Sequence, residues 1–284
     1  MTFARAIAHH NCRGRYTSHG EDGMLHRLDS EGLICITQPA HAWVAGCLAR
    51  AWGNEQFGYF APTEEVLLGA EQHDVGWLSW EQSPTLNAKT GYPHKFMEVA
   101  PSVHTKLWSN AKNLTLPIGR YATLLVSLHG TGLYERFRSW EKYPESNKVV
   151  QDFLKDEYTF QEKLIANLQE DSYYKPHTTP DAIKRNRSLV ATWDALSLAV
   201  CHKVHNEQHI DNVPTAQGET TLTLKPIDNN PNQISVSPWP FQQTKVTLTY
   251  EGRLLHSTFT DEEAMRSALV NSRWVTITNT LIPR

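Results

Sequence analysis

The sequence lacks the features of membrane, secreted disulfide-bonded and nucleic-acid-binding proteins. Its apolar runs are too short to span a bilayer, and neither an apolar signal segment nor a lipidation motif opens the chain. The four cysteines include no CxxC pair, which favours reduced thiols in a cytosol over a disulfide framework. The formal net charge is −3, with no basic run to attract nucleic acid. We therefore expect a soluble cytoplasmic protein that binds neither membranes nor nucleic acid.

Several motifs of well-known enzyme classes are also missing. No GxSxG, Walker A loop or GxGxxG is present, so serine-hydrolase and nucleotide-fold interpretations lack support. What the chain does have in quantity is histidine and tryptophan, with 14 and 9 residues among 284. The positions of the histidines therefore become the main question.

The periodicity of apolar residues predicts an α+β protein that is mainly α. Short strands and turns are expected over residues 1–36, and the pattern then predicts helices over residues 37–52, 64–78, 102–111, 119–134, 148–170 and 181–207. From residue 218 onward, Thr, Val and Ile alternate with polar residues, which is typical of antiparallel strands. We expect a helical core over residues 1–217 and a C-terminal antiparallel β-rich portion over residues 218–284, packed together as one structural unit.

The most informative stretch lies near the end of the predicted helix 64–78. One apolar stripe of this helix contains a carboxylate, because Asp74 shares it with Leu67, Ala70 and Trp77. A carboxylate on a core-facing stripe is costly unless it is paired, hydrogen-bonded or bound to a metal ion. An imidazole, His73, directly precedes it. The pair indicates a metal site, although two residues alone are a weak motif.

Other predicted helices present the same kinds of ligand on apolar faces. The full candidate set is His41, His73, Asp74, His104, His129 and Asp194. A buried histidine or aspartate is more often a hydrogen-bonded core residue than a ligand, but five separate helical faces would then need unrelated explanations. Imidazole and carboxylate without thiolate favour Fe, Mn or Zn. The set serves one divalent ion, or two if Asp74 bridges them.

The order His, His-Asp, His, His, Asp over a helical core resembles the HD superfamily of metal-dependent phosphohydrolases. The resemblance implies an HD-type helical core in which His41, His73, Asp74 and Asp194 hold the first ion. It assigns His104 and His129 to a second ion. Two departures stand out: Val75-Gly76-Trp77 follows the HD pair, and no lysine or arginine lies within that motif to hold a phosphate.

The wider sequence also resembles a bacterial family catalogued as a domain of unknown function, number 3891. This likeness extends over most of the chain but implies no activity. The matching stretches are Thr37-Gln38-Pro39-Ala40-His41, His73-Asp74-Val75-Gly76-Trp77, Leu125-Val126-Ser127-Leu128-His129, Trp193-Asp194-Ala195-Leu196-Ser197-Leu198 and Ser237-Pro238-Trp239-Pro240-Phe241.

These observations lead us to expect a metal-dependent hydrolase that acts on a small molecule, a phosphate ester above all, with a metal-activated water. Asp74 and His129 are the expected catalytic residues, and the loop over residues 79–101 is expected to border the substrate. Gln38, Trp77 and Trp80 are candidate substrate contacts, although core packing explains the tryptophans equally well. HD proteins also include di-iron oxygenases, so an oxygenase on the same ligands and a non-catalytic ligand-binding module remain alternatives. A homo-oligomer is compatible with each of these interpretations.

Overall fold

The computed structural model describes residues 24–95 and 98–284 of the chain. Residues 1–23 and 96–97 lie outside the described residues, so the strands and turns expected over residues 1–36 are tested only from residue 24 onward. There, strands β1 (Leu25–Asp29) and β2 (Gly32–Ile36) form an antiparallel hairpin. Among the described helices, none has both the length and the apolar character needed to cross a bilayer.

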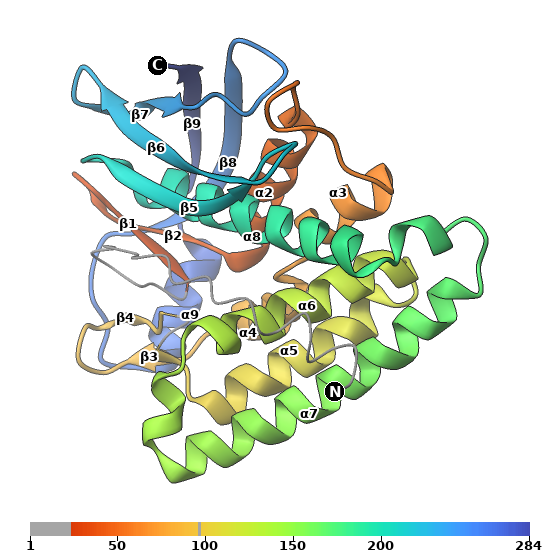
Figure 1. The fold of residues 1–284 in the computed structure, drawn as a ribbon. Helices are drawn as coiled ribbons and strands as arrows, with labels where there is room; N and C mark the ends of the chain where they lie inside the picture. The colour runs from red at the N-terminus through yellow and green to blue at the C-terminus, as the bar shows by residue number, and fades with distance from the viewer. Residues whose placement is uncertain (1–23, 96–97) are drawn as a thin grey trace.

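A seven-stranded mixed sheet forms one side of the molecule (Figure 1). Its strands lie in the order β1-β2-β8-β9-β7-β6-β5. Strands β5 to β9 span Gln208–Pro214, Glu219–Ile227, Asn230–Ser237, Val246–Leu255 and Trp274–Pro283. In β8 buried and outward residues alternate, as expected for a strand with one face on the core. A separate two-stranded ribbon joins β3 (Leu86–Asn87) to β4 (Tyr92–Pro93).

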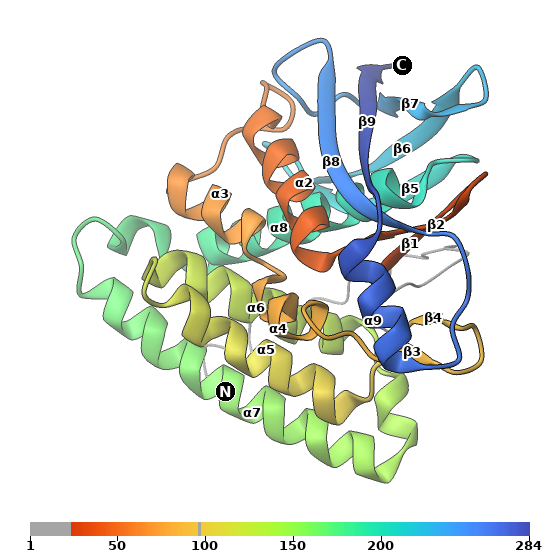
Figure 2. The ribbon, with the colours of Figure 1, turned by 180° about the vertical axis from the view of Figure 1, so that it is seen from behind.

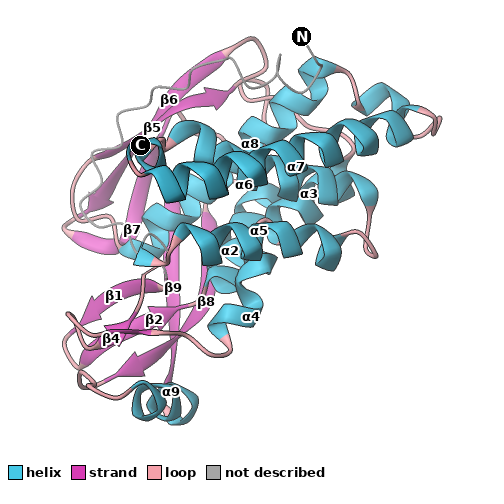
Figure 3. Ribbon diagram, turned by 90° about the horizontal axis from the view of Figure 1, so that it is seen from below, coloured by secondary structure: helices cyan, strands magenta, loops and turns pink. Residues whose placement is uncertain are grey.

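The helices form the rest of the molecule. They are α2 (Gln38–Ala51), α3 (Thr63–Glu71), α4 (Leu78–Glu81), α5 (Pro101–Thr115), α6 (Arg120–Arg136), α7 (Pro144–Gln169), α8 (Pro180–His202) and α9 (Glu262–Asn271). Short 3-10 helices η1 (Val75–Trp77), η3 (Ser139–Lys142) and η4 (Lys175–His177) connect some of them. Helices α2 and α8 pack on each other and on the sheet, with α5, α6 and α7 on their far side (Figures 1 and 2). Figure 3 shows the same separation of strands and helices from below.

The predicted α+β class is confirmed, but the sheet is not purely antiparallel. The last strand, β9, inserts between β8 and β7, pairing antiparallel with β8 and parallel with β7. An alternating pattern identifies a strand but not its neighbours, so the sequence could not reveal this insertion. Strands β1, β2 and β5 precede residue 218 and still belong to the sheet. The division of the chain at that residue stays a prediction.

A buried arginine fastens the sheet to the end of α8. Arg27 on β1 is 4% exposed, and its guanidinium donates to the Tyr250 hydroxyl at 2.9 Å and to the Cys201 carbonyl at 3.5 Å. That carbonyl lies in the last turn of α8, where the helix dipole favours a positive charge. The contact therefore fixes the position of α8 relative to β1 and β8.

A buried polar network fixes the other helices. The Glu157 carboxylate on α7 accepts from the Ser127 hydroxyl on α6 at 2.6 Å and pairs with Lys112 on α5. Gln161 adds a bond to Ser127 at 2.9 Å. Since each partner is satisfied, the network sets the rotation of α6, and His129 is directed toward α2 and α8 rather than toward α7.

The predicted helix over residues 64–78 is interrupted. Helix α3 ends at Glu71, and His73 and Asp74 lie in the turn between α3 and η1. The chain passes very close to α5 here. A Cβ added to Gly76 would lie only 2.4 Å from the Leu107 carbonyl oxygen. The break lets His73 and Asp74 approach the same point, which adjacent residues of a regular helix do less easily.

This close approach makes Gly76 a sensitive position. We expect Gly76→Ala to lower the free energy of unfolding by about 1–3 kcal/mol, because the new methyl group meets backbone rather than a movable side chain. Gly218→Ala is the matched control, since its added Cβ has no atom within 4 Å, and its effect should stay within about 0.5 kcal/mol. Urea denaturation measures both. Equal stability of the two variants would contradict the close packing of η1 on α5.

Candidate metal centre

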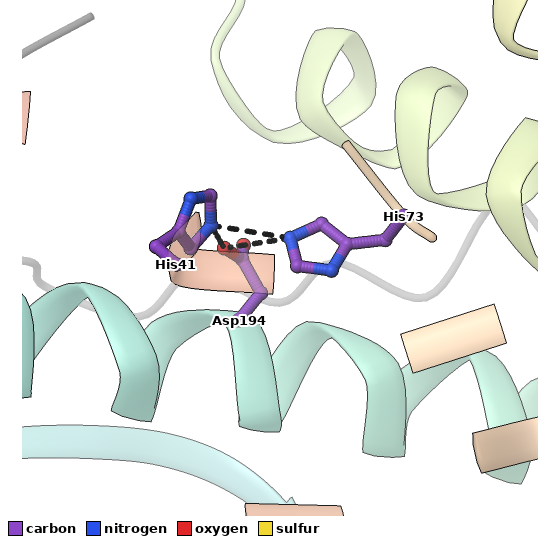
Figure 4. Close-up of side chains that lie close together, drawn as sticks. All are labelled: His41, His73 and Asp194. Atoms are coloured by element: carbon purple, nitrogen blue, oxygen red, sulfur yellow. Dashed lines mark hydrogen bonds and ion pairs between the residues drawn. The ribbon is translucent and has the colours of Figure 1, made fainter. Parts of the chain in front are cut away.

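Five of the six predicted ligands lie together in the interior of the molecule. His41 comes from α2, His129 from α6 and Asp194 from α8, while His73 and Asp74 come from the turn after α3. None of the five is more than 7% exposed. Figure 4 shows His41, His73 and Asp194 pointing toward one another from three different segments. Side chains from four separate parts of the fold thus converge on one small volume.

The spacing of the ligand atoms matches the coordination shell of a metal ion. His41 Nε2 lies 3.2 Å from His73 Nε2, 3.2 Å from Asp194 Oδ1 and 3.3 Å from Asp74 Oδ2. His73 Nε2 lies 3.4 Å from Asp194 Oδ1 and 3.6 Å from Asp74 Oδ2. Ligand atoms about 2.0–2.2 Å from one ion lie roughly 2.8–3.6 Å from each other, depending on the geometry. His41, His73 and Asp194 are therefore spaced as ligands of one ion, and Asp74 lies at a similar distance from both imidazoles.

His73 is held in the tautomer that ligation requires. Its Nδ1 lies 2.7 Å from the Ala70 carbonyl oxygen, so Nδ1 carries the hydrogen and donates. In the neutral ring, Nε2 then directs a lone pair at the cluster. A backbone carbonyl behind a histidine ligand is the usual way in which proteins fix a ligating imidazole.

The local electrostatics call for a positive charge at the centre. Burial alone would raise the pKa of Asp194, yet hydrogen bonds from His41 and His73 hold it well below its usual range. Burial would lower the pKa of His73, but Asp74 and Asp194 raise it to about 9. The pKa of Asp74 is raised by burial, against the opposing effect of His73 and His41. A proton on His73 therefore supplies this positive charge in the metal-free chain, and a metal ion would supply it as well.

His129 extends the cluster on one side. Its Nε2 is 4.0 Å from Asp194 Oδ2, and its ring centroid is 4.6 Å from that of His73. Burial, together with the charge on His73, lowers its pKa well below the usual value, so the ring is neutral. Among the described residues, His73, Asp74 and His129 form a second group whose ligand atoms lie within 4.8 Å of one another. This group overlaps the group of His41, His73 and Asp194.

The structure does not bring His104 together with the other five. Its ring lies against Trp77 and Trp108, and the Trp108 ring also contacts His129. The Trp108 indole donates to His104 Nε2 at 3.0 Å, and the Tyr134 hydroxyl bonds to Nδ1. Both ring nitrogens are thus already engaged.

The three predicted substrate contacts lie near the cluster but are buried. Gln38 is the first residue of α2, one turn before His41, and is 2% exposed. Trp77 and Trp80 are 1% and 8% exposed, and their rings pack edge to face at 5.7 Å. Both belong to a hydrophobic cluster with Trp108 and Trp140. Contact of these residues with a substrate stays a prediction.

Sequence reasoning missed a third carboxylate. Glu81, the last residue of α4, accepts from the Gln38 backbone N–H at 2.9 Å, and its Oε2 is buried with no hydrogen-bond partner among the described residues. Burial raises its pKa to about 8, against that hydrogen bond, and the charge of Asp74 adds to the rise. No spacing rule connects Glu81 to the HD pair, because a helix break separates them.

Glu81 should make the stability of the protein depend on pH. The folded chain keeps a proton on Glu81 up to about pH 8, whereas the unfolded chain loses it near 4.5, so stability should fall as the pH rises between these values. Glu81→Gln removes the titrating group and keeps the acceptor for Gln38. We expect its urea midpoint to fall less than that of the wild type between pH 5.5 and pH 8. Parallel pH profiles for the two proteins would show that Glu81 ionises as an ordinary surface glutamate.

Comparison with known proteins adds one match. Residues 24–257 match the model of the family described as "Protein of unknown function (DUF3891)". Searches of curated proteins and of solved structures give no match. The matched range includes all the residues of the candidate metal centre and most of the sheet. This chain is a member of the DUF3891 family.

Proposed function

We propose that the protein is a metal-dependent hydrolase that cleaves a small phosphate ester with a metal-activated water. The observation that supports this best is the set of five distances between 3.2 and 3.6 Å among the Nε2 atoms of His41 and His73 and the carboxylate oxygens of Asp74 and Asp194. Hydrolysis is the reaction most directly served by such a centre, because it needs only a bound water and a polarised substrate oxygen.

The order of the ligands along the chain supports an HD-type assignment. A histidine on one helix, a His-Asp pair after the next and an aspartate on a late helix are the elements expected of the HD superfamily. In that assignment His41, His73, Asp74 and Asp194 hold the first ion. Imidazole and carboxylate ligands favour Fe, Mn or Zn over harder or softer ions.

Each side chain has a distinct role in this proposal. A bound divalent ion lowers the pKa of its water enough to supply hydroxide near neutral pH. Asp74 contributes one oxygen to the centre and directs the water with the other. His129 is neutral and lies beside Asp194, where its Nε2 can stabilise charge that develops on the substrate. Glu81 keeps a proton close to Asp74 that can be passed to a leaving group.

A second candidate is a di-iron oxygenase on the same ligands. It is favoured by the overlap of the two groups, because His73 occurs in both and Asp74 of the second group lies 3.3 Å from His41 of the first. Two ions sharing these residues would lie close together. Visible absorption and oxygen consumption of iron-loaded protein distinguish this alternative from hydrolysis. A non-catalytic module would show neither.

The first test is metal content. We expect protein purified without chelator to contain one or two ions of Fe, Mn or Zn per chain, and His73→Ala to contain less than a tenth of that amount. His209→Ala is the matched control, because His209 lies on β5 with half its side chain exposed and should keep the wild-type content. Elemental analysis by mass spectrometry measures all three. A metal-free wild type, or equal metal in His73→Ala, would disprove the site.

The second test is catalysis. A screen of generic phosphomonoesters and phosphodiesters with Mn, Fe and Zn should reveal metal-dependent hydrolysis. Asp74→Asn should reduce the rate by more than the roughly 10–100-fold loss typical of residues behind a metal ligand. The unfolding midpoint of Asp74→Asn, measured in parallel, shows whether the variant is folded. Oxygen uptake without hydrolysis would favour the oxygenase instead.

A further inference from the structure

A pocket lies outside the metal centre, between the start of α5 and the end of α6. Its volume is about 290 Å³. The walls are mainly apolar and aromatic, with Leu133, Tyr134, Phe137 and Trp140 among them. Phe137 is 42% exposed and Tyr143 is 64% exposed, so the mouth of the pocket presents aromatic surface to solvent. The polar lining groups include His104 and the hydroxyl of Tyr134.

The direction of the hydrogen bonds around His104 follows from elementary chemistry. An indole N–H only donates, so His104 Nε2, which lies 3.0 Å from Trp108 Nε1, must accept. Burial lowers the pKa of His104 to about 4, so the ring is neutral and carries its one hydrogen on Nδ1. That hydrogen is donated to the oxygen of Tyr134. The order of donation is therefore Trp108, then His104, then Tyr134.

This order determines what Tyr134 offers to a ligand. Its oxygen accepts from His104, so its own hydrogen points elsewhere, and among the described residues no acceptor for it is found. Burial raises the pKa of Tyr134, so the hydroxyl keeps its hydrogen across the physiological range. Tyr134 lines the pocket. The pocket thus combines apolar walls with one oriented hydrogen-bond donor, the arrangement typical of small-molecule sites.

The size of the pocket limits the ligand. A cavity of about 150 Å³ holds benzene, so one of about 290 Å³ has room for two fused rings. No charged side chain is among its lining residues, so burying a charged ligand would be costly. We propose that this pocket binds a neutral bicyclic aromatic molecule that accepts a hydrogen bond from Tyr134.

The pocket is physically separate from the metal centre. His104 lines the pocket, and its ring contacts Trp108 at a centroid distance of 6.0 Å; Trp108 in turn contacts His129 at 5.4 Å. None of the five clustered ligands lines it. The proposal therefore holds or fails independently of the hydrolase assignment.

The experiment compares two bicyclic aromatic probes of similar size. Quinoline accepts a hydrogen bond through its ring nitrogen, whereas indole only donates, and both are neutral at pH 7.5. We expect calorimetry to show quinoline binding roughly 3- to 10-fold more tightly than indole, which is the effect of one net hydrogen bond. Tyr134→Phe should abolish this preference by weakening quinoline alone.

Ser146→Trp provides the second variant. Ser146 is half-buried at the pocket wall on the first turn of α7, so an indole there should fill the pocket and weaken both probes at least tenfold while Tyr134 itself is unchanged. Circular dichroism confirms that each variant is folded. Failure of quinoline to bind, equal affinity for the two probes in the wild type, or unchanged quinoline binding in Tyr134→Phe would each overturn the proposal.

Discussion

Two carboxylates and three imidazoles meet in the interior, and such a meeting is tolerated only if positive charge lies between them. Asp74 and Asp194 would repel each other at this depth, and the facing Nε2 atoms of His41 and His73 would bring lone pairs together at 3.2 Å. A proton on one ring relieves this conflict in the metal-free chain, and a bound metal ion would relieve it too. The fold maintains the arrangement through contacts made by other residues.

Those contacts belong to two parts of the molecule that meet at the cluster. Arg27 ties the end of α8 to the sheet, and the network around Glu157 fixes α6 against α5 and α7. The turn after α3 lies between these parts, where Gly76 packs on α5. Because each ligand is positioned by a different contact, the geometry depends on the whole fold rather than on any one helix.

The sequence predicted which polar residues would be buried in the helices better than it predicted their surroundings. His41 and Asp194 lie on helices whose apolar faces and Thr caps are readable from local pattern, so their burial was predictable. The break after Glu71 was not, because it is imposed by packing against Leu107 and no proline or glycine stands at the break itself. His104 has the same helical pattern as the clustered residues, but its ring nitrogens form hydrogen bonds with Tyr134 and Trp108. The burial of the Glu81 carboxylate and the parallel pairing of β9 with β7 likewise depend on contacts between residues that are distant in sequence.

The clustered residues lie as far apart in sequence as His41 and Asp194. An ion shared by them would join distant segments of the folded chain, and its binding free energy would add to the stability of the fold, because the unfolded chain does not hold these residues together. Loading and folding would then be two aspects of one equilibrium. In such a protein, the supply of the ion would set the lifetime of the native state as well as the activity.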